Sequence, residues 1–187
     1  MPDITRPDHF LQLARTLDRV FDDLPQAEHL RRGDDISPAI HSVVSDIGYI
    51  LTEISEELTT SNRHDYEGWG HGPAERFGTA ALTQCAPPLG TALAHLGRIV
   101  DRLGFLHENV RHSSTARTPT PGDVRLVLQE HLDHVGTALR TAAQQLRGTA
   151  TQLSRTTSSH ARATSARNTH AQPPSPIPAP ASSPGPR

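Results

Sequence analysis

The sequence predicts an all-α protein in which residues 1–155 form an antiparallel bundle of three to four helices and residues 156–187 form a disordered tail. Apolar residues recur at gaps of three and four in four segments, as on the buried face of a helix. Only 4% of the 187 residues are aromatic and 34% are hydrophobic, so the core is aliphatic, which suits helix-on-helix packing. The last thirty residues are rich in Pro, Ser, Thr and Arg, a composition that cannot bury a core.

Residues 7–24 are predicted to form the first helix. Their apolar side chains fall on one face of a helix with 3.6 residues per turn. This face consists of Phe10, Leu13, Ala14, Leu17, Val20, Phe21 and Leu24. Pro25 follows and ends the segment, because proline cannot continue a helix.

The second helix is predicted over residues 38–61. Ser37 is a suitable N-cap, and Pro38 fits the first helical position, where its missing N–H is not needed. The apolar face consists of Ile40, Val43, Val44, Ile47, Ile50, Leu51, Ile54 and Leu58. A polar link over residues 61–72 is expected to separate this helix from the next.

The third helix is predicted to begin at Gly72-Pro73-Ala74-Glu75 and to be interrupted at Pro87-Pro88. After the interruption, two rows repeat every seven residues: the leucines Leu89, Leu96 and Leu103, and the glycines Gly90, Gly97 and Gly104. Each interior glycine costs about 1 kcal/mol relative to alanine. Close backbone approach by a neighbouring helix would compensate for that cost; chance occurrence of glycine is the alternative. These six residues, together with Trp69, are the candidate interaction positions.

The fourth helix is predicted to start at the capping sequence Thr120-Pro121-Gly122-Asp123. Its apolar face consists of Val124, Leu128, Leu132, Val135, Leu139, Ala142, Leu146 and Leu153. Threonine, glycine and serine become frequent near its end, which predicts fraying between Gly148 and Arg155. The proline-rich run beyond residue 172 favours polyproline II structure.

The net charge of −2 conceals a gradient along the chain. Residues 1–75 contain fifteen acids and six arginines, whereas residues 134–187 contain six arginines and no acid. Arg140, Arg147, Arg155 and Arg162 follow one side of the last helix and its extension. Nucleic acid is an unlikely partner, because aromatic stacking residues are missing there; ion pairs with the acidic second helix would explain the same arginines.

No catalytic residue is predicted, and the chain is expected not to be an enzyme. The single cysteine, Cys85, excludes an intrachain disulfide, and it stands beside two prolines with no histidine nearby in sequence. A small packing residue is the expected role for it. No glycine-rich phosphate loop follows a strand.

Twelve histidines raise the question of a metal site. His64, Asp65, Glu67 and His71 cluster in the predicted link, and His131 and His134 lie on the fourth helix, with His107 on the equivalent face of the third. A carboxylate-bridged di-metal bundle needs a Glu-x-x-His motif on each of two helices, and this sequence has none. We therefore predict no metal and no cofactor, and keep a histidine-based metal protein as an alternative.

No run of about 18 apolar residues is present, so no membrane span is predicted, and the N-terminal residues lack the apolar region of a cleaved signal peptide. A cytoplasmic protein is expected, with export without a cleaved signal as the alternative.

Residues 37–111 read as helix, tryptophan-containing turn, helix, with Phe77 eight residues after Trp69. This pattern resembles the WXG family of small helical hairpins, which are exported by type VII secretion systems and pair into four-helix dimers. His71 replaces the glycine of the Trp-x-Gly turn, and Pro87-Pro88 interrupts the second helix. The resemblance implies that Trp69 contributes to the turn or to export.

The sequence as a whole predicts a non-catalytic helical interaction protein that self-associates or binds a helical partner through its heptad leucine rows. A WXG-like secretion substrate or partner is the alternative from the family resemblance.

Overall fold

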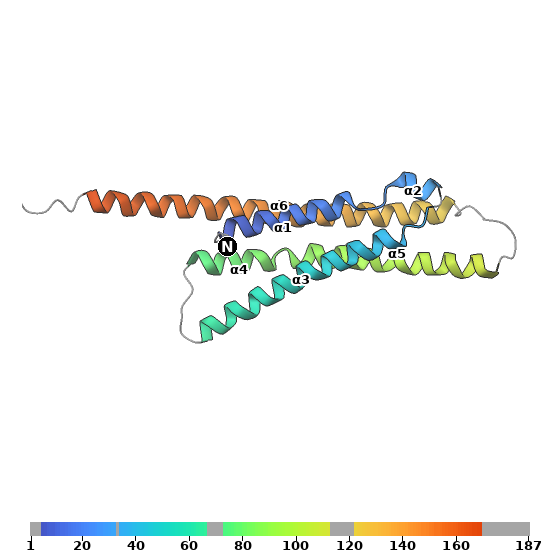
Figure 1. Cartoon of the computed structure of the whole chain (residues 1–187), viewed down its shortest axis with the longest axis horizontal. Helices are drawn as coiled ribbons and strands as arrows, with labels where there is room; N and C mark the ends of the chain where they lie inside the picture. The colour runs from blue at the N-terminus through green and yellow to red at the C-terminus, as the bar shows by residue number, and fades with distance from the viewer. Residues whose placement is uncertain (1–4, 33, 67–72, 113–121, 170–187) are drawn as a thin grey trace, which may run out of the picture.

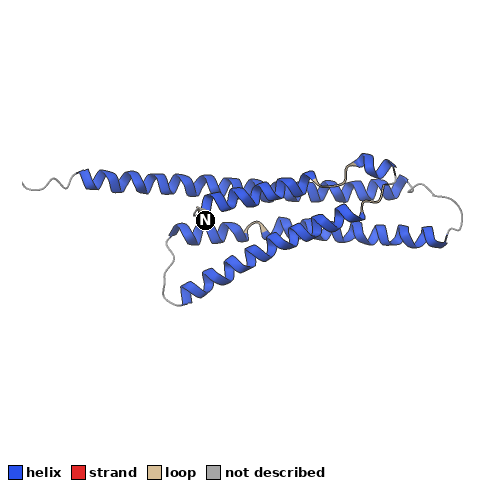
Figure 2. Ribbon diagram, viewed as in Figure 1, coloured by secondary structure: helices blue, strands red, loops and turns tan. Residues whose placement is uncertain are grey.

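The computed structural model describes residues 5–32, 34–66, 73–112 and 122–169. Every regular element in these ranges is an α-helix: α1 (Arg6–Asp22), α2 (Ala27–Arg32), α3 (Ser37–Tyr66), α4 (Pro73–Thr83), α5 (Ala86–His112) and α6 (Gly122–Thr169). The helices lie along one long axis in an elongated bundle (Figures 1 and 2). The prediction of an all-α antiparallel bundle is confirmed; the short helix α2 was not predicted.

Helix α6 is the element around which the others pack. It contains 48 residues, which corresponds to a length of about 72 Å at 1.5 Å per residue. Its most extensive contacts are with α1 and α5, and α4 and α2 add smaller ones. Both α1 and α5 run in the opposite direction to α6 (Figure 1).

The core is built from the apolar faces that the sequence predicts. In α1, Phe10, Leu13, Ala14, Leu17 and Val20 are buried. The matching face of α6 is buried from Leu128 to Leu153, and alanines fill the positions between its larger side chains. Small residues there let α1 and α5 approach α6 closely, so the helix–helix contacts are dense.

Helix α3 begins where the sequence predicts, but a different residue caps it. The side chain of Asp35 accepts a hydrogen bond of 3.0 Å from the backbone N–H of Ser37, so Asp35 satisfies a free donor of the first turn and Ser37 already belongs to the helix. The helix continues to Tyr66, through half of the predicted polar link. It contacts α5 more than α1 or α4, and it diverges from α4 toward its C-terminal end (Figure 1).

The interruption of the third predicted helix is confirmed. Helix α4 ends at Thr83, and α5 begins at Ala86. Pro87 and Pro88 therefore occupy the first turn of the new helix, where proline is tolerated because the N–H groups have no intrahelical acceptor. The break precedes the prolines, since their rings would clash with the carbonyls of a helix continuing from α4.

The predicted fraying between Gly148 and Arg155 is wrong. Ala150 and Leu153 are buried in the core, and this packing keeps the segment helical although its serine and threonine hydroxyls bond to backbone carbonyls one turn earlier. The α6 backbone continues to Thr169, past the ends of α1 and α4, which moves the end of the helix beyond the predicted boundary at residue 155 (Figure 1). Residues 170–187 lie outside the described ranges, so the tail there remains a prediction.

The glycine that allows close helix packing within the chain is not one of the three glycines predicted to do so. An added Cβ at Gly90, Gly97 or Gly104 would meet no atom within 4 Å in the described part of the chain, so the described helices do not pack closely against these glycines. At Gly136 on α6, by contrast, an added Cβ would lie 2.9 Å from Cε2 of Phe21. Gly136 therefore permits the close α1–α6 contact.

Candidate interaction surface

Two of the three predicted interaction leucines belong to the chain's own core. Leu89 and Leu96 are fully buried between α5 and its neighbours. They cannot be offered to a partner without unfolding, so their prediction as interaction positions requires correction. Leu103, the last of the row, is only partly buried.

An open groove of about 670 Å³ lies between the first part of α3 and the last part of α5. Apolar side chains form much of its lining: Ile40, Val44, Val100, Leu103 and Leu106. Gly104 contributes backbone to the same surface. The groove therefore combines two predicted interaction positions, Leu103 and Gly104, with apolar residues from a second helix.

Val100 is the most exposed apolar side chain of the groove, with 53% of its surface accessible. It lies three residues after Gly97 and four residues before Gly104, so all three share one face of α5. Both glycines leave open space where a side chain would be. The face is a protruding side chain between two depressions, which is the shape by which one helix packs against another.

Polar groups border the apolar lining of the groove. Ser37, His41 and His107 belong to its wall together with Asp35. The hydrogen bond from the Ser37 backbone N–H lowers the pKa of Asp35 below its ordinary value, so this carboxylate is charged at neutral pH. The groove thus has an apolar floor and a partly charged border, as binding surfaces usually do.

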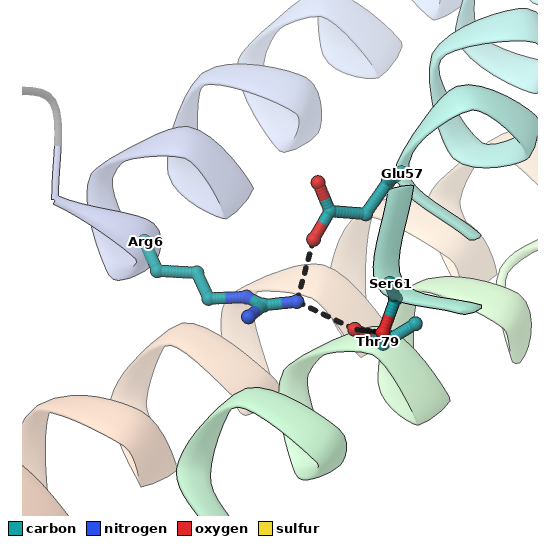
Figure 3. A network of polar contacts seen from close by, with 4 residues as sticks. All are labelled: Arg6, Glu57, Ser61 and Thr79. Atoms are coloured by element: carbon teal, nitrogen blue, oxygen red, sulfur yellow. Dashed lines mark hydrogen bonds and ion pairs between the residues drawn. The ribbon is translucent and has the colours of Figure 1, made fainter. Parts of the chain in front are cut away.

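Arg6 joins three helices at the opposite end of the bundle (Figure 3). Its guanidinium donates to a carboxylate oxygen of Glu57 at 2.6 Å and to the hydroxyl of Thr79 at 2.7 Å. The Thr79 hydroxyl lies 3.5 Å from that of Ser61. Gly78 allows this arrangement, because an added Cβ would lie 2.6 Å from the Arg6 side chain. The cluster holds α1 against α3 and α4.

Replacing Arg6 with alanine should lower the free energy of unfolding by about 1–2 kcal/mol, the lower part of the range for hydrogen bonds to charged groups. The low value follows because the Arg6 and Glu57 side chains keep 27% and 37% of their surface exposed to solvent. Urea denaturation would measure it. Arg15→Ala on the exposed side of the same helix is the matched control and should change stability by less than about 0.5 kcal/mol. Equal losses in both variants would contradict the role assigned to Arg6.

A histidine cluster lies between α5 and α6. Nδ1 of His95 is 3.2 Å from Nδ1 of His131, and the ring of His134 stacks on that of His95 with 4.6 Å between ring centres. The predicted counterpart of His131, His107, instead lines the groove beside α3. The pairing with His95 was missed because it depends on the register between antiparallel α5 and α6, which the sequence does not reveal.

Partial burial is the main reason that the pKa values of His95 and His131 lie below 6.5. Positive charge on Arg98 and on neighbouring histidines lowers both further, whereas Glu130 opposes the effect. Nδ1 of His134 contacts the Glu130 carbonyl oxygen at 2.7 Å. Burial and the neighbouring positive charges thus favour the neutral form of both rings.

Cys85 is buried at the junction of α4 and α5, with its Sγ 3.8 Å from the carbonyl oxygens of Ala81 and Ala142. Burial raises the pKa of this thiol to about 11. Because the thiolate is the nucleophilic form, this environment makes Cys85 unreactive at neutral pH. Its contacts are those of a packing residue.

Two arginines of the predicted basic stripe, Arg140 and Arg147, contact α1 and not the acidic second predicted helix. Arg147 pairs with Asp18, and the guanidinium carbon of Arg140 lies 4.2 Å from the ring centre of Phe21. The side chain of Arg162 lies outside those described. An intramolecular explanation of the basic stripe is thus correct for Arg140 and Arg147, but with a different partner helix.

Trp69, Glu67 and His71 lie outside the described residues, as do the side chains of His64 and Asp65. The resemblance to the WXG family and the predicted role of Trp69 therefore remain predictions. In the part of the chain that is described, no group of three or more His, Cys, Asp or Glu side chains is arranged to hold a metal ion. None of the helices in that part combines the length and apolarity needed to cross a bilayer.

Comparison with known proteins gives no relative: no family model, no curated protein sequence and no solved structure matches this chain. Functional inference therefore depends on the surfaces described above.

Proposed function

We propose that the chain is a non-catalytic helical interaction protein that self-associates through the α3–α5 groove. The observation that supports this most directly is the shape of the exposed α5 face. Val100 is 53% exposed there between Gly97 and Gly104, and it lines the groove together with Val44 of α3, which is only partly buried.

The proposal gives one explanation for Gly97, Val100 and Gly104, which share an exposed face of α5. Interior glycines lower helix stability, and an exposed valine gains nothing from folding of the chain alone. Contact with another helix would shield the valine and would use the space above the glycines. Isolated exposed apolar residues are ordinary on protein surfaces, so the argument depends on the combination with the groove and not on Val100 alone.

A second copy is the occupant that this surface fits best. In an isologous contact about a two-fold axis, the same patch is used on both subunits. Antiparallel packing of two α5 helices would place Val100 of each subunit over the depression at a glycine of the other. The patch is therefore complementary to itself, and the groove beside it would accommodate side chains from the second α5.

Light scattering after size exclusion tests the proposal. The wild-type chain should be a dimer at micromolar concentration, and Val100→Arg should weaken dimerisation at least about tenfold, because it places a charge in the contact. Leu126→Arg is the matched control: Leu126 on α6 is 71% exposed and outside the groove, so the variant should dimerise as the wild type does. A wild-type chain that is monomeric at all concentrations, or equal weakening in both variants, would overturn the proposal.

A further inference from the structure

The histidine pair between α5 and α6 is separate from the groove. His95 and His131 are 36 residues apart in the sequence, and each comes from a different helix. Both rings are partly buried within the α5–α6 contact. Their Nδ1 atoms face each other at 3.2 Å. With no atom between them, this is a hydrogen bond in which the protonated Nδ1 of one ring donates to the unprotonated Nδ1 of the other.

The same separation suits a shared metal ion. Zinc binds histidine nitrogens at about 2.0–2.1 Å, so two such ligands at the tetrahedral angle lie roughly 3.4 Å apart. The observed 3.2 Å differs from this by an amount that small side-chain rotations absorb. We infer that His95 and His131 form a two-histidine site that binds a divalent transition-metal ion, with water completing the coordination.

The surroundings of the pair support this assignment. Neutral imidazole is the form that coordinates metals, and partial burial, which lowers the pKa of both rings, favours that form. His134 stacks on His95 and so restricts its ring. Glu130 contributes negative charge near the pair, whereas Arg98 and Arg102 contribute positive charge. With two protein ligands, the site would bind more weakly than a closed structural zinc site.

Metal binding at this pair would connect α5 with α6. In the unfolded chain the two ligands are separated by more than thirty residues, so the folded protein binds the ion preferentially. Preferential binding to the folded state raises the unfolding temperature in proportion to the logarithm of the metal concentration above Kd. Binding and thermal stability are thus two independent readouts of one site.

The experiment is calorimetric titration of tag-free protein with ZnCl2 at pH 7.5, with thermal unfolding at the same metal concentrations. Thermal unfolding in the absence of metal first establishes that each variant folds. His95→Gln and His131→Gln should each weaken binding at least about tenfold and remove most of the metal-dependent rise in unfolding temperature, because one ligand is left.

His29→Gln is the matched control, since His29 is exposed on α2, where its Nδ1 accepts a hydrogen bond from the backbone N–H of Gln26. It should bind zinc as the wild type does. Absence of binding at millimolar zinc, or affinities of the His95 and His131 variants within twofold of the wild type, would overturn the inference. In the first case the pair is a plain hydrogen-bonded contact; in the second the ion is bound by other histidines. Neither outcome bears on dimerisation through the α3–α5 groove.

Discussion

Replacing Leu96 with alanine should lower the free energy of unfolding by about 2–5 kcal/mol, the range for removing a large aliphatic side chain from a packed core. Leu96 has no accessible surface and lies in the core cluster shared by α5 and α6. The loss combines the removed apolar area with the cavity that remains, because neighbouring helices relax only partly. Urea denaturation at several protein concentrations would measure it.

The concentration dependence distinguishes a core leucine from an interface leucine. If Leu96 supports the fold of each chain, Leu96→Ala should lower the free energy of unfolding by the same amount at low and high protein concentration in the monomeric Val100→Arg background. Leu126→Ala on the exposed surface should change stability by less than about 0.5 kcal/mol. A Leu96→Ala chain that keeps its stability but loses its oligomeric state would contradict the core assignment and restore the leucine row as an interface.

The triple replacement of Gly90, Gly97 and Gly104 with alanine should raise the stability of the monomeric chain by about 2–3 kcal/mol. Each substitution recovers up to about 1 kcal/mol of helix propensity, and the added methyl groups meet open space. Thermal unfolding in the Val100→Arg background would measure this gain without a contribution from association.

Two comparisons distinguish the effect of helix propensity from the effect of contacts at the glycines. In the wild-type background, Gly97→Ala and Gly104→Ala should weaken dimerisation because they fill the depressions beside Val100, whereas Gly90→Ala, farther along α5, should not. Gly136→Val should lower the free energy of unfolding by about 1–3 kcal/mol, because the new side chain would overlap the Phe21 ring. A loss of monomer stability from the triple substitution would show that these glycines are already in close contact.

The presence of the long helices could be predicted because it depends on the spacing of apolar residues along the sequence. The apolar faces beginning at Phe10, Ile40 and Leu128 are buried, and the proline pair marks a real break. Ends were less predictable, because tertiary contacts decide them. Ala150 and Leu153 pack into the core and hold a segment whose composition favours fraying. Asp35, not Ser37, caps α3, a choice between neighbouring polar residues that propensity alone does not make.

The candidate sites depend on helix register, which periodicity does not specify. A heptad row of leucines predicts that the row is buried, but it does not show whether the same chain or a partner covers it. The sequence therefore predicts Leu89 and Leu96 as interaction positions, although the chain buries them itself. The approach of Phe21 to Gly136 and of His95 to His131 likewise arises from how far antiparallel helices are shifted along each other. Val100 between two glycines was visible in the sequence, but its exposure was not.

Hydrogen–deuterium exchange at two protein concentrations tests the proposed interface most directly, because it reports position as well as association. At the concentration where the dimer forms, exchange should slow in residues 35–44 and 97–107 and stay unchanged in residues 126–153 of α6, which are protected within each chain. Slowing confined to α6 or α1, or no segment whose exchange depends on concentration, would contradict self-association through the α3–α5 groove.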